Sequence, residues 1–420
     1  MITDAGFEVV LVKASTNERE RVNRMAEQVE VLVVGAGPTG LLTALGLARS
    51  GIKVRVVEAE DAIIASPRAI VYHWSVLEGL DTLGVLDDAL RIGFPKQDYT
   101  YLDWKSGEQI VISVGALEGL VRFPHNLHIG QDKLAEIALS HLRELGATVE
   151  FGVRVIGLEQ GDDHVVVTAD RAGESVDYRA SWVIGADGAR STVRHAIGAE
   201  FEGITWDERF VATNIRFPFD AHGYSRSTLQ MDDRYGAIIA KIDETDLWRC
   251  TYCEDARLPE ESVLDRMPAY FNAVLPGDKK YELVQYSPYR MHQRAATTFR
   301  SGRIVLAGDA AHATNPTGGL GLTSGLFDAY VLYPAMAAIV RGEADDRILD
   351  VYSEERRRTF LEIASPQAAE NKRFVYHQSD PVRKAADLER LRKMAADRDL
   401  QIERFMGSKR LETPSLVGRE

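Results

Sequence analysis

The stretch that decides the fold begins Val29-Glu30-Val31-Leu32-Val33-Val34, continues Gly35-Ala36-Gly37-Pro38-Thr39-Gly40, and closes about twenty residues later at Glu58. Apart from one glutamate the first six residues are apolar, and four of them are β-branched valines, which is typical of a strand buried on both faces. Leu41, Leu42 and Leu45 follow with helical spacing, and residues 54–57 form a second buried run. Strand, glycine turn, helix, strand and acid within about thirty residues predict a βαβ unit that binds a dinucleotide.

Each glycine of the turn has a physical role in this prediction. Gly35 permits the tight turn, Gly37 lets the backbone approach a pyrophosphate, and Gly40 lets the helix pack against the strand. The free N–H groups and positive end of the helix would face the diphosphate, and Glu58 could accept hydrogen bonds from the adenosine ribose. The alternative is a turn that serves helix packing alone, with Glu58 on the surface.

Length and charge narrow the class of protein. A chain of 420 residues can bury a large core and indicates two or three domains, or one interrupted domain. The net charge of −13 argues against nucleic acid or an anionic membrane as a partner. No stretch has the roughly eighteen uninterrupted apolar residues of a membrane span, and the N-terminus lacks the apolar core of a signal peptide. We therefore expect a cytoplasmic protein.

Two pairs of residues have spacings that invite a metal or redox interpretation. Cys250 and Cys253 lie in a segment typical of a strand, where positions three apart face opposite sides, roughly 10 Å from each other. His125 and His128 have no accompanying cysteine or carboxylate cluster. We expect neither a disulfide nor a metal site.

Two later segments repeat the pattern of a buried strand that ends in an acid. One contains Gly185-Ala186-Asp187-Gly188, and the other contains Gly308-Asp309-Ala310-Ala311-His312. An aspartate just past a buried parallel strand lies at the carboxyl edge of the sheet, where doubly wound folds bind ligands. One such aspartate is often only a turn or cap residue. Two of them, together with the glycine turn, indicate a single crevice.

With these motifs the chain resembles the flavoprotein aromatic monooxygenases of the para-hydroxybenzoate hydroxylase type. The resemblance rests on the glycine turn, on the Asp187 segment with Ser191 and Arg194, and on the Asp309 segment followed by Pro316, and it covers roughly residues 29–358. It implies that FAD is the cofactor and that NADPH or NADH is the co-substrate. The reaction would be hydroxylation of a phenolic or related aromatic compound by molecular oxygen through a flavin hydroperoxide.

The resemblance also implies a fold and domain boundaries. We expect an α/β protein with a Rossmann-like FAD-binding domain at residues 29–200 and 290–345, and a mostly antiparallel substrate-binding sheet inserted at 201–289. Part of the substrate wall would lie near 95–125, and the inserted sheet would cover the flavin. Residues 346–420 would form a C-terminal helical segment and tail, where residues 381–407 could be a surface or an interface helix. Residues 1–28 would be a leader or extension.

The resemblance assigns roles to single residues as well. Glu58 would hold the adenosine ribose, and Arg68 would reach the diphosphate, unless it is only a solvated loop arginine. Gln131 would contact FAD, Asp187 would shape the site for FAD and nicotinamide, and Asp309 would bind the ribityl chain. The complete expected FAD-binding set is Gly35, Gly37, Pro38, Thr39, Gly40, Glu58, Arg68, Gln131, Asp187, Asp309, Pro316, Gly319, Leu320, Gly321 and Leu322.

Residue chemistry supports the last part of that set. A glycine-rich loop that opens a helix near residue 323 presents N–H groups and a positive dipole end, which would stabilise negative charge on reduced flavin. The alternative is an ordinary glycine-rich helix entry. Thr323 stands where many relatives have asparagine. No second strand-linked glycine motif is present, so the nicotinamide would bind transiently over the shared crevice.

The base that activates a phenolic substrate has three candidates: Tyr72, His73 and Tyr235. Tyr289 and His292 also approach the flavin region in this interpretation. Each of these side chains could instead be ordinary packing. The sequence leaves open the aromatic substrate, NADH against NADPH, and a monomer against a homodimer.

Three other functions share the same cofactor cradle. An FAD-dependent dehydrogenase or reductase of a cyclic small molecule would use it without oxygen insertion. A flavin halogenase would carry a tryptophan-rich motif that is absent here. A flavin-binding regulatory or scaffold protein would show no NAD(P)H oxidation with any aromatic compound.

Overall fold

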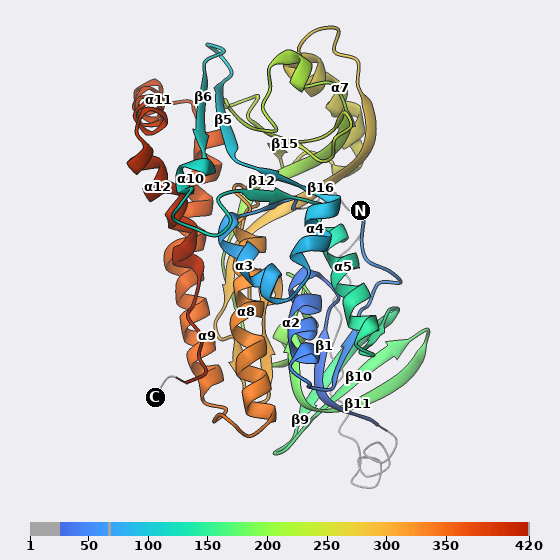
Figure 1. Cartoon of the computed structure of the whole chain (residues 1–420). Coiled ribbons are helices and arrows are strands. Elements are labelled where there is room, and N and C mark those ends of the chain that lie inside the picture. Colours follow the sequence, from blue (N-terminus) through green and yellow to red (C-terminus); the bar gives the residue numbers. More distant parts are fainter. Residues whose placement is uncertain (1–25, 66–68, 419–420) are drawn as a thin grey trace.

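The computed structural model of the protein describes residues 26–65 and 69–418, which form two large sheets, a small third sheet and the helices around them (Figure 1). The expected α/β class is confirmed. Arg68 and residues 1–25 of the expected leader lie outside the described residues.

The first sheet carries the glycine turn, and its strands run in the order β17-β18-β11-β1-β2-β8. The bounds are β1 Glu27–Val34, β2 Val54–Val57, β8 Thr148–Glu150, β9 Val153–Gln160, β10 Val165–Arg171, β11 Glu174–Gly185, β17 Arg300–Ser301 and β18 Ile304–Leu306. Strands β1, β2, β11 and β18 are parallel neighbours. Their carboxyl ends therefore share one edge, and this brings together Gly35, Glu58, Asp187 and Asp309 as the sequence predicts.

The glycine turn is fixed by close backbone contacts. Gly35 has a φ of 107°, and its N–H donates to the Val57 carbonyl of β2 at 2.8 Å. A Cβ at Gly35 would lie 2.4 Å from the Ala186 carbonyl oxygen, and a Cβ at Gly40 would lie 2.1 Å from that of Gly35. Neither position has room for a side chain, so helix α2, Pro38–Arg49, starts directly on the sheet.

The second sheet runs β19-β16-β12-β15-β14-β13-β5-β6, and all its pairs are antiparallel except β13 with β5. The bounds are β5 Asp98–Asp103, β6 Gln109–Ser113, β12 Phe201–Arg216, β13 Ser227–Met231, β14 Ala237–Lys241, β15 Leu247–Asp255, β16 Glu282–Ala296 and β19 His312–Ala313. The expectation of a mostly antiparallel sheet is confirmed. The sheet also takes in β5 and β6 from the expected wall, and β16 continues beyond residue 289.

Strand β15 has two different faces. Cys250 is buried on the face that packs against helix α7, Val263–Val274, whereas Cys253 packs beside Phe210 and Tyr376. Both cysteines are free. The strand interpretation of this segment is therefore confirmed, because residues three apart point to opposite sides of the sheet.

Helix α8, Leu320–Val340, is the core helix of the molecule. Among the described residues it alone is long and apolar enough to cross a membrane, but 72% of that stretch is buried inside the protein. It begins at Leu320 rather than near residue 323, because Gly318 and Gly319 adopt left-handed φ angles of 90° and 70° and turn the chain into the helix.

Shorter elements complete the body of the fold. The third sheet joins β3 Val71–Tyr72, β7 Asn126–His128 and β4 Phe94–Lys96. The remaining helices before residue 340 are α3 Trp74–Thr82, α4 Leu86–Ile92, α5 Gln131–Glu144 and α6 Thr192–Ala196.

The C-terminal helices run along one side of the molecule up to β5 and β6 (Figure 1). They are α9 Ile348–Thr359, α10 Ser365–Tyr376, α11 Pro381–Ala396 and α12 Arg398–Met406, with a π-helical turn at Phe360–Ala364. Leu388 and Leu391 of α11 are buried beside Tyr101 and Ile110. The apolar face of the expected surface or interface helix is thus used within the chain itself.

A buried ion-pair network joins α8 to the edge of the first sheet and to the C-terminal segment. Asp328 Oδ1 accepts from Arg356 Nε at 2.7 Å, and its Oδ2 accepts from the Gly308 N–H at 2.9 Å and lies 2.7 Å from His312 Nε2. Arg356 also donates to the Leu411 carbonyl at 2.7 Å. The three ionisable side chains are fully buried.

The pKa of Asp328 follows from this environment. Burial alone would raise it, but His312 and Arg356 lower the pKa to about 2. The stabilisation is therefore present above the ordinary value of 3.8 and is lost as the pH falls from there toward 2.

We predict that Asp328→Asn lowers the free energy of unfolding by about 3–5 kcal/mol, because it leaves the Arg356 charge buried without a partner. Denaturant unfolding at neutral pH measures this. Asp345→Asn is the control, since Asp345 pairs with Arg347 on the surface and its loss should leave the stability almost unchanged. Equal stability of the two variants would contradict the role given to the network.

Candidate functional site

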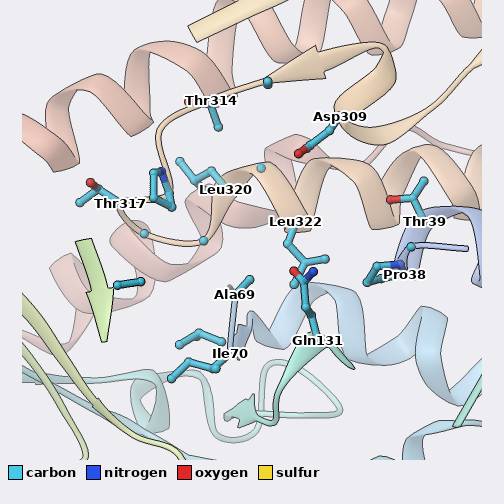
Figure 2. Close-up of a pocket in the computed structure, with 18 of the residues that line it drawn as sticks. Pro38, Thr39, Ala69, Ile70, Gln131, Asp309, Thr314, Thr317, Leu320 and Leu322 are labelled. Carbon is cyan, nitrogen blue, oxygen red and sulfur yellow. The ribbon is translucent and has the colours of Figure 1, made fainter. Parts of the chain in front are cut away.

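A cavity of about 1260 Å³ lies between the edge of the first sheet and one face of the second. It is larger than the roughly 300–1,000 Å³ of ordinary small-molecule sites. It therefore has room for a large cofactor together with a small substrate. In Figure 2, Pro38, Thr39 and Asp309 lie toward one side of the view, and Thr314, Thr317 and Leu320 toward the other.

The carboxylate of Glu58 is held in place at the end of β2. The Ala36 N–H donates to its Oε2 at 2.7 Å, and the Glu60 N–H donates to its Oε1 at 3.0 Å. Glu58 lines the cavity beside the glycine turn. The carboxylate of Glu58 is thus fixed beside the cavity, while Gly37 leaves open space in which a Cβ would touch nothing within 4 Å.

Asp187 lines the cavity, but its carboxylate is used within the fold. Ser191 Oγ donates to Oδ1 at 2.5 Å and the Val193 N–H donates to Oδ2 at 3.2 Å, which ties the loop after β11 to the start of α6. Burial raises the pKa of this carboxyl. Asp187 therefore shapes the loop, whereas Asp309 is exposed and lines the cavity (Figure 2).

The N-terminus of α8 opens onto the cavity without a side-chain cap. Gly319, Gly321 and Leu322 line the cavity, and Figure 2 shows Leu322 and Gln131 pointing toward one another. The Thr317 hydroxyl lines it too and, among the described residues, is buried without a partner. Uncapped N–H groups, a positive helix end and this hydroxyl fit the polar edge of an isoalloxazine.

The side chain of Thr323 makes its hydrogen bond at the start of helix α8. Its hydroxyl donates to the Gly319 carbonyl at 2.9 Å, and the side chain is buried. Its contact is with the loop that opens α8.

One face of the second sheet covers the cavity, and we call it the roof. The roof consists of Tyr99, Tyr101, Ala212, Ser227, Leu229, Ile238, Ala240, Arg249 and Thr251. These residues alternate along their strands, so every second side chain faces the cavity. The C-terminal helices close one side with Leu391, Met394 and Phe405.

The structure separates the three candidates for a phenol-activating base. His73 lines the cavity, and its Nε2 donates to the Gly318 carbonyl at 2.6 Å, so it holds the loop before α8. Burial lowers the pKa of His73, which favours the neutral ring. Tyr289 and His292 also line the cavity.

The expectation that Tyr72 or Tyr235 acts on the substrate needs correction, because neither lines the cavity. Tyr72 alternates with Val71 and His73 and so points into the core, where it is fully buried. Tyr235 lies in the turn between β13 and β14 and packs against Trp104 and Tyr270 on the α7 side of the sheet.

Tyr99 and Arg249 face the cavity but were not predicted from the sequence. Tyr99 belongs to an alternating segment without a motif, and Arg249 lies next to Cys250 in a segment that has no motif around the arginine. A charged residue between Trp248 and Cys250 in a buried strand was the available signal for Arg249.

The hydroxyl of Tyr99 has a defined orientation. The side-chain oxygen of Asn126 accepts from the Trp74 N–H at 2.9 Å, so its Nδ2 faces Tyr99 and donates to the phenol oxygen. Burial raises the pKa of Tyr99 and keeps it protonated. Its own hydrogen is then free to donate to an acceptor in the cavity.

Comparisons with known proteins agree with this geometry. The FAD binding domain family matches residues 28–364. The chain is 46% identical to 6-hydroxy-3-succinoylpyridine 3-monooxygenase HspB of Pseudomonas putida over 84% of this chain and 91% of that protein. It is 42% identical to para-nitrophenol 4-monooxygenase of a Pseudomonas species over 88% of this chain and 92% of that one. The crystal structure of p-nitrophenol 4-monooxygenase PnpA from Pseudomonas putida matches with a TM-score of 0.89 at 39% identity, covering 92% of this chain and 99% of that one.

Gly37 and Gly40 of the glycine turn give a matched test of the cofactor site. We predict that Gly37→Ala folds with unchanged thermal stability but binds FAD roughly tenfold more weakly or worse, because its methyl group enters the space of the diphosphate. Gly40→Ala should be destabilised even without FAD, because its Cβ would collide with the Gly35 carbonyl. FAD titration and thermal unfolding of both variants measure these effects. Full FAD affinity in Gly37→Ala would refute the placement of the FAD diphosphate beside Gly37.

Proposed function

Since the chain belongs to the FAD binding domain family and is an FAD-dependent aromatic monooxygenase, we propose that its substrate is a small phenol or hydroxylated heteroaromatic ring. The observation that carries the proposal is one continuous cavity that joins the dinucleotide edge, the uncapped start of α8 and the roof. The two relatives act, by their names, on a hydroxylated pyridine and on a nitrophenol. Both are monooxygenases, which argues against a dehydrogenase.

The residues that would hold FAD line the cavity from the glycine turn to the start of α8. Glu58 would bind the adenosine ribose, and the turn at Gly35, Gly37, Pro38 and Thr39 would bind the diphosphate. Asp309 would bind the ribityl chain, and Gln131 would contact the flavin from the start of α5. Pro316 and the loop Gly319, Leu320, Gly321 and Leu322 would border the ring. The bound flavin would supply electrons from NADPH or NADH and activated oxygen.

The protein itself must exclude water from the cavity and orient the aromatic ring of the substrate. Apolar side chains of the roof and of α11 and α12 exclude water that would compete for the activated oxygen. Tyr99 would donate its free hydroxyl hydrogen to the phenol oxygen of the substrate and stabilise the phenolate, which makes the ring electron rich. His73 would act indirectly, by holding the Gly318 carbonyl.

We also propose that the protein works in the cytoplasm, as a monomer or homodimer, without nucleic acid or membrane. The net charge of −13 and the burial of α8 in the core support this. The domain boundaries at residues 200, 289 and 345 remain a prediction.

Tyr99→Phe tests whether Tyr99 of the roof donates a hydrogen bond to the phenol oxygen of the substrate. We predict that it slows hydroxylation of 4-nitrophenol or 4-hydroxybenzoate about tenfold or more, because a hydrogen bond to a charged oxygen is lost, while FAD content is unchanged. Product and oxygen consumption are measured per NADPH or NADH oxidised. Tyr235→Phe is the matched control and should behave as wild type, because Tyr235 lies outside the cavity. Wild-type turnover in Tyr99→Phe would remove Tyr99 from the mechanism.

A further inference from the structure

Lys96 is a buried lysine that contacts the ring of Tyr99. It is the last residue of β4, where it pairs with Asn126 of β7, and only 6% of it is exposed. Its ammonium nitrogen lies 4.8 Å from the centre of the Tyr99 ring. Tyr99 lines the cavity and Lys96 does not, so the ammonium is shielded from the cavity by the protein.

Asn126 contacts the other end of the same tyrosine. Its amide donates to the Tyr99 hydroxyl, as described above. The two residues that face each other across β4 and β7 thus act on one side chain, Lys96 on the ring and Asn126 on the hydroxyl.

The ammonium of Lys96 has no acid to neutralise it, unlike those of the other lysines that are buried in the described part of the chain. Lys241 pairs with Asp220 at 2.8 Å, and Lys372 pairs with Glu208 at 3.2 Å. The nitrogen of Lys96 is buried without a hydrogen-bond partner among the same residues. Burying such a charge is costly, and its contact with the face of an aromatic ring returns only part of that cost.

The groups around Lys96 leave it charged in part at neutral pH. Burial lowers the pKa of Lys96 to about 7, while nearby Asp98 raises the pKa and Arg226 lowers it. His128 of β7 lies close by, and burial, with Lys96 next in effect, lowers its pKa to about 3, so its ring is neutral. A negative charge in front of Tyr99 would favour the charged form of Lys96.

We propose that Lys96 is a positioning residue, which acts through Tyr99 to favour the ionised form of the phenolic substrate. An ammonium over the face of an aromatic ring is attracted to its π electrons and polarises them. The Tyr99 hydroxyl then becomes a stronger donor toward the cavity, which stabilises a phenolate more than a phenol. The proposal rests on the proposed function, because the substrate hydroxyl must meet Tyr99.

The test measures the ionisation constant of 4-nitrophenol bound to the FAD-loaded enzyme, from the visible absorption of the phenolate across a pH series. In the wild type this constant should be about tenfold or more larger than for the free compound in water. Lys96→Met should reduce it about tenfold with unchanged FAD content. Lys96→Arg keeps a cation beside the ring and should retain most of the effect.

A matched control and a stability measurement separate this role from a structural one. Lys105→Met removes an exposed lysine that pairs with Asp233, and it should leave the ionisation constant unchanged. Lys96→Met removes a buried charge that has no acid partner, so its thermal unfolding temperature should equal or exceed that of the wild type. If Lys96→Met does not fold, Lys96→Gln removes the charge for the same measurement.

The route through Tyr99 is tested by combining two substitutions. In a Tyr99→Phe background, Lys96→Met should change the ionisation constant of bound 4-nitrophenol little, because the hydroxyl that Lys96 polarises is absent. A reduction as large as in the wild-type background overturns the proposal.

The remaining outcomes distinguish this proposal from the proposed function. An unchanged ionisation constant in Lys96→Met, or a wild type that does not raise the constant at all, overturns the role of Lys96. If 4-nitrophenol is nevertheless hydroxylated, the proposed function stands. If neither 4-nitrophenol nor 4-hydroxybenzoate binds or is hydroxylated, the proposed function fails, and the role of Lys96 fails with it.

Discussion

The buried carboxylate of Asp328 connects the parts of this protein that must meet around the cofactor. It lies on α8, and it accepts hydrogen bonds from the backbone beside Asp309 and from Arg356 of α9. Arg356 in turn holds the Leu411 carbonyl of the C-terminal segment, which lines the cavity. One carboxylate thus fixes α8, the edge of the first sheet and the C-terminal segment relative to one another. Burying this charge costs desolvation free energy, which is offset only because the carboxylate is fully paired.

The side chains of Asp328, His312 and Arg356 are not part of the cavity lining, but they fix elements that are. The start of α8 can stay uncapped and face a ligand because the body of the helix is fixed from behind. His73 adds a second restraint by holding the Gly318 carbonyl in front of the same helix. The roof is built separately, from alternating residues of the second sheet, and can vary in its polar groups without disturbing the cofactor edge. Division of the site between a fixed cofactor edge and a variable roof suits an enzyme class in which one cofactor serves many substrates.

The residues that we expect at the cofactor edge follow directly from local rules in the sequence. A glycine turn, an acid after a buried strand and a glycine-rich helix entry each need particular residue types at fixed spacing, and Gly35, Glu58, Asp309 and Leu322 all line the cavity. The roof could not be predicted in the same way. Which face of β5 meets the cavity depends on its pairing with β13, more than a hundred residues later in the chain. The face of β15 depends on its pairing with β14, and a shift of one position in either pair would turn Tyr99 or Arg249 away. Tyr72 was proposed because it follows the Arg68 loop, and Tyr235 because it lies in the inserted sheet. Strand pairing and packing place both outside the cavity lining.

The measurement that tests the central claim most directly is stopped-flow reduction of the bound flavin by NADPH and by NADH, with and without a phenol in the cavity. A monooxygenase whose flavin and substrate share one cavity should reduce its flavin orders of magnitude faster when a suitable phenol is bound, and one of the two nucleotides should be preferred. Equally fast reduction without any aromatic compound would contradict this account, because occupation of the cavity beneath the roof would then have no influence on the flavin.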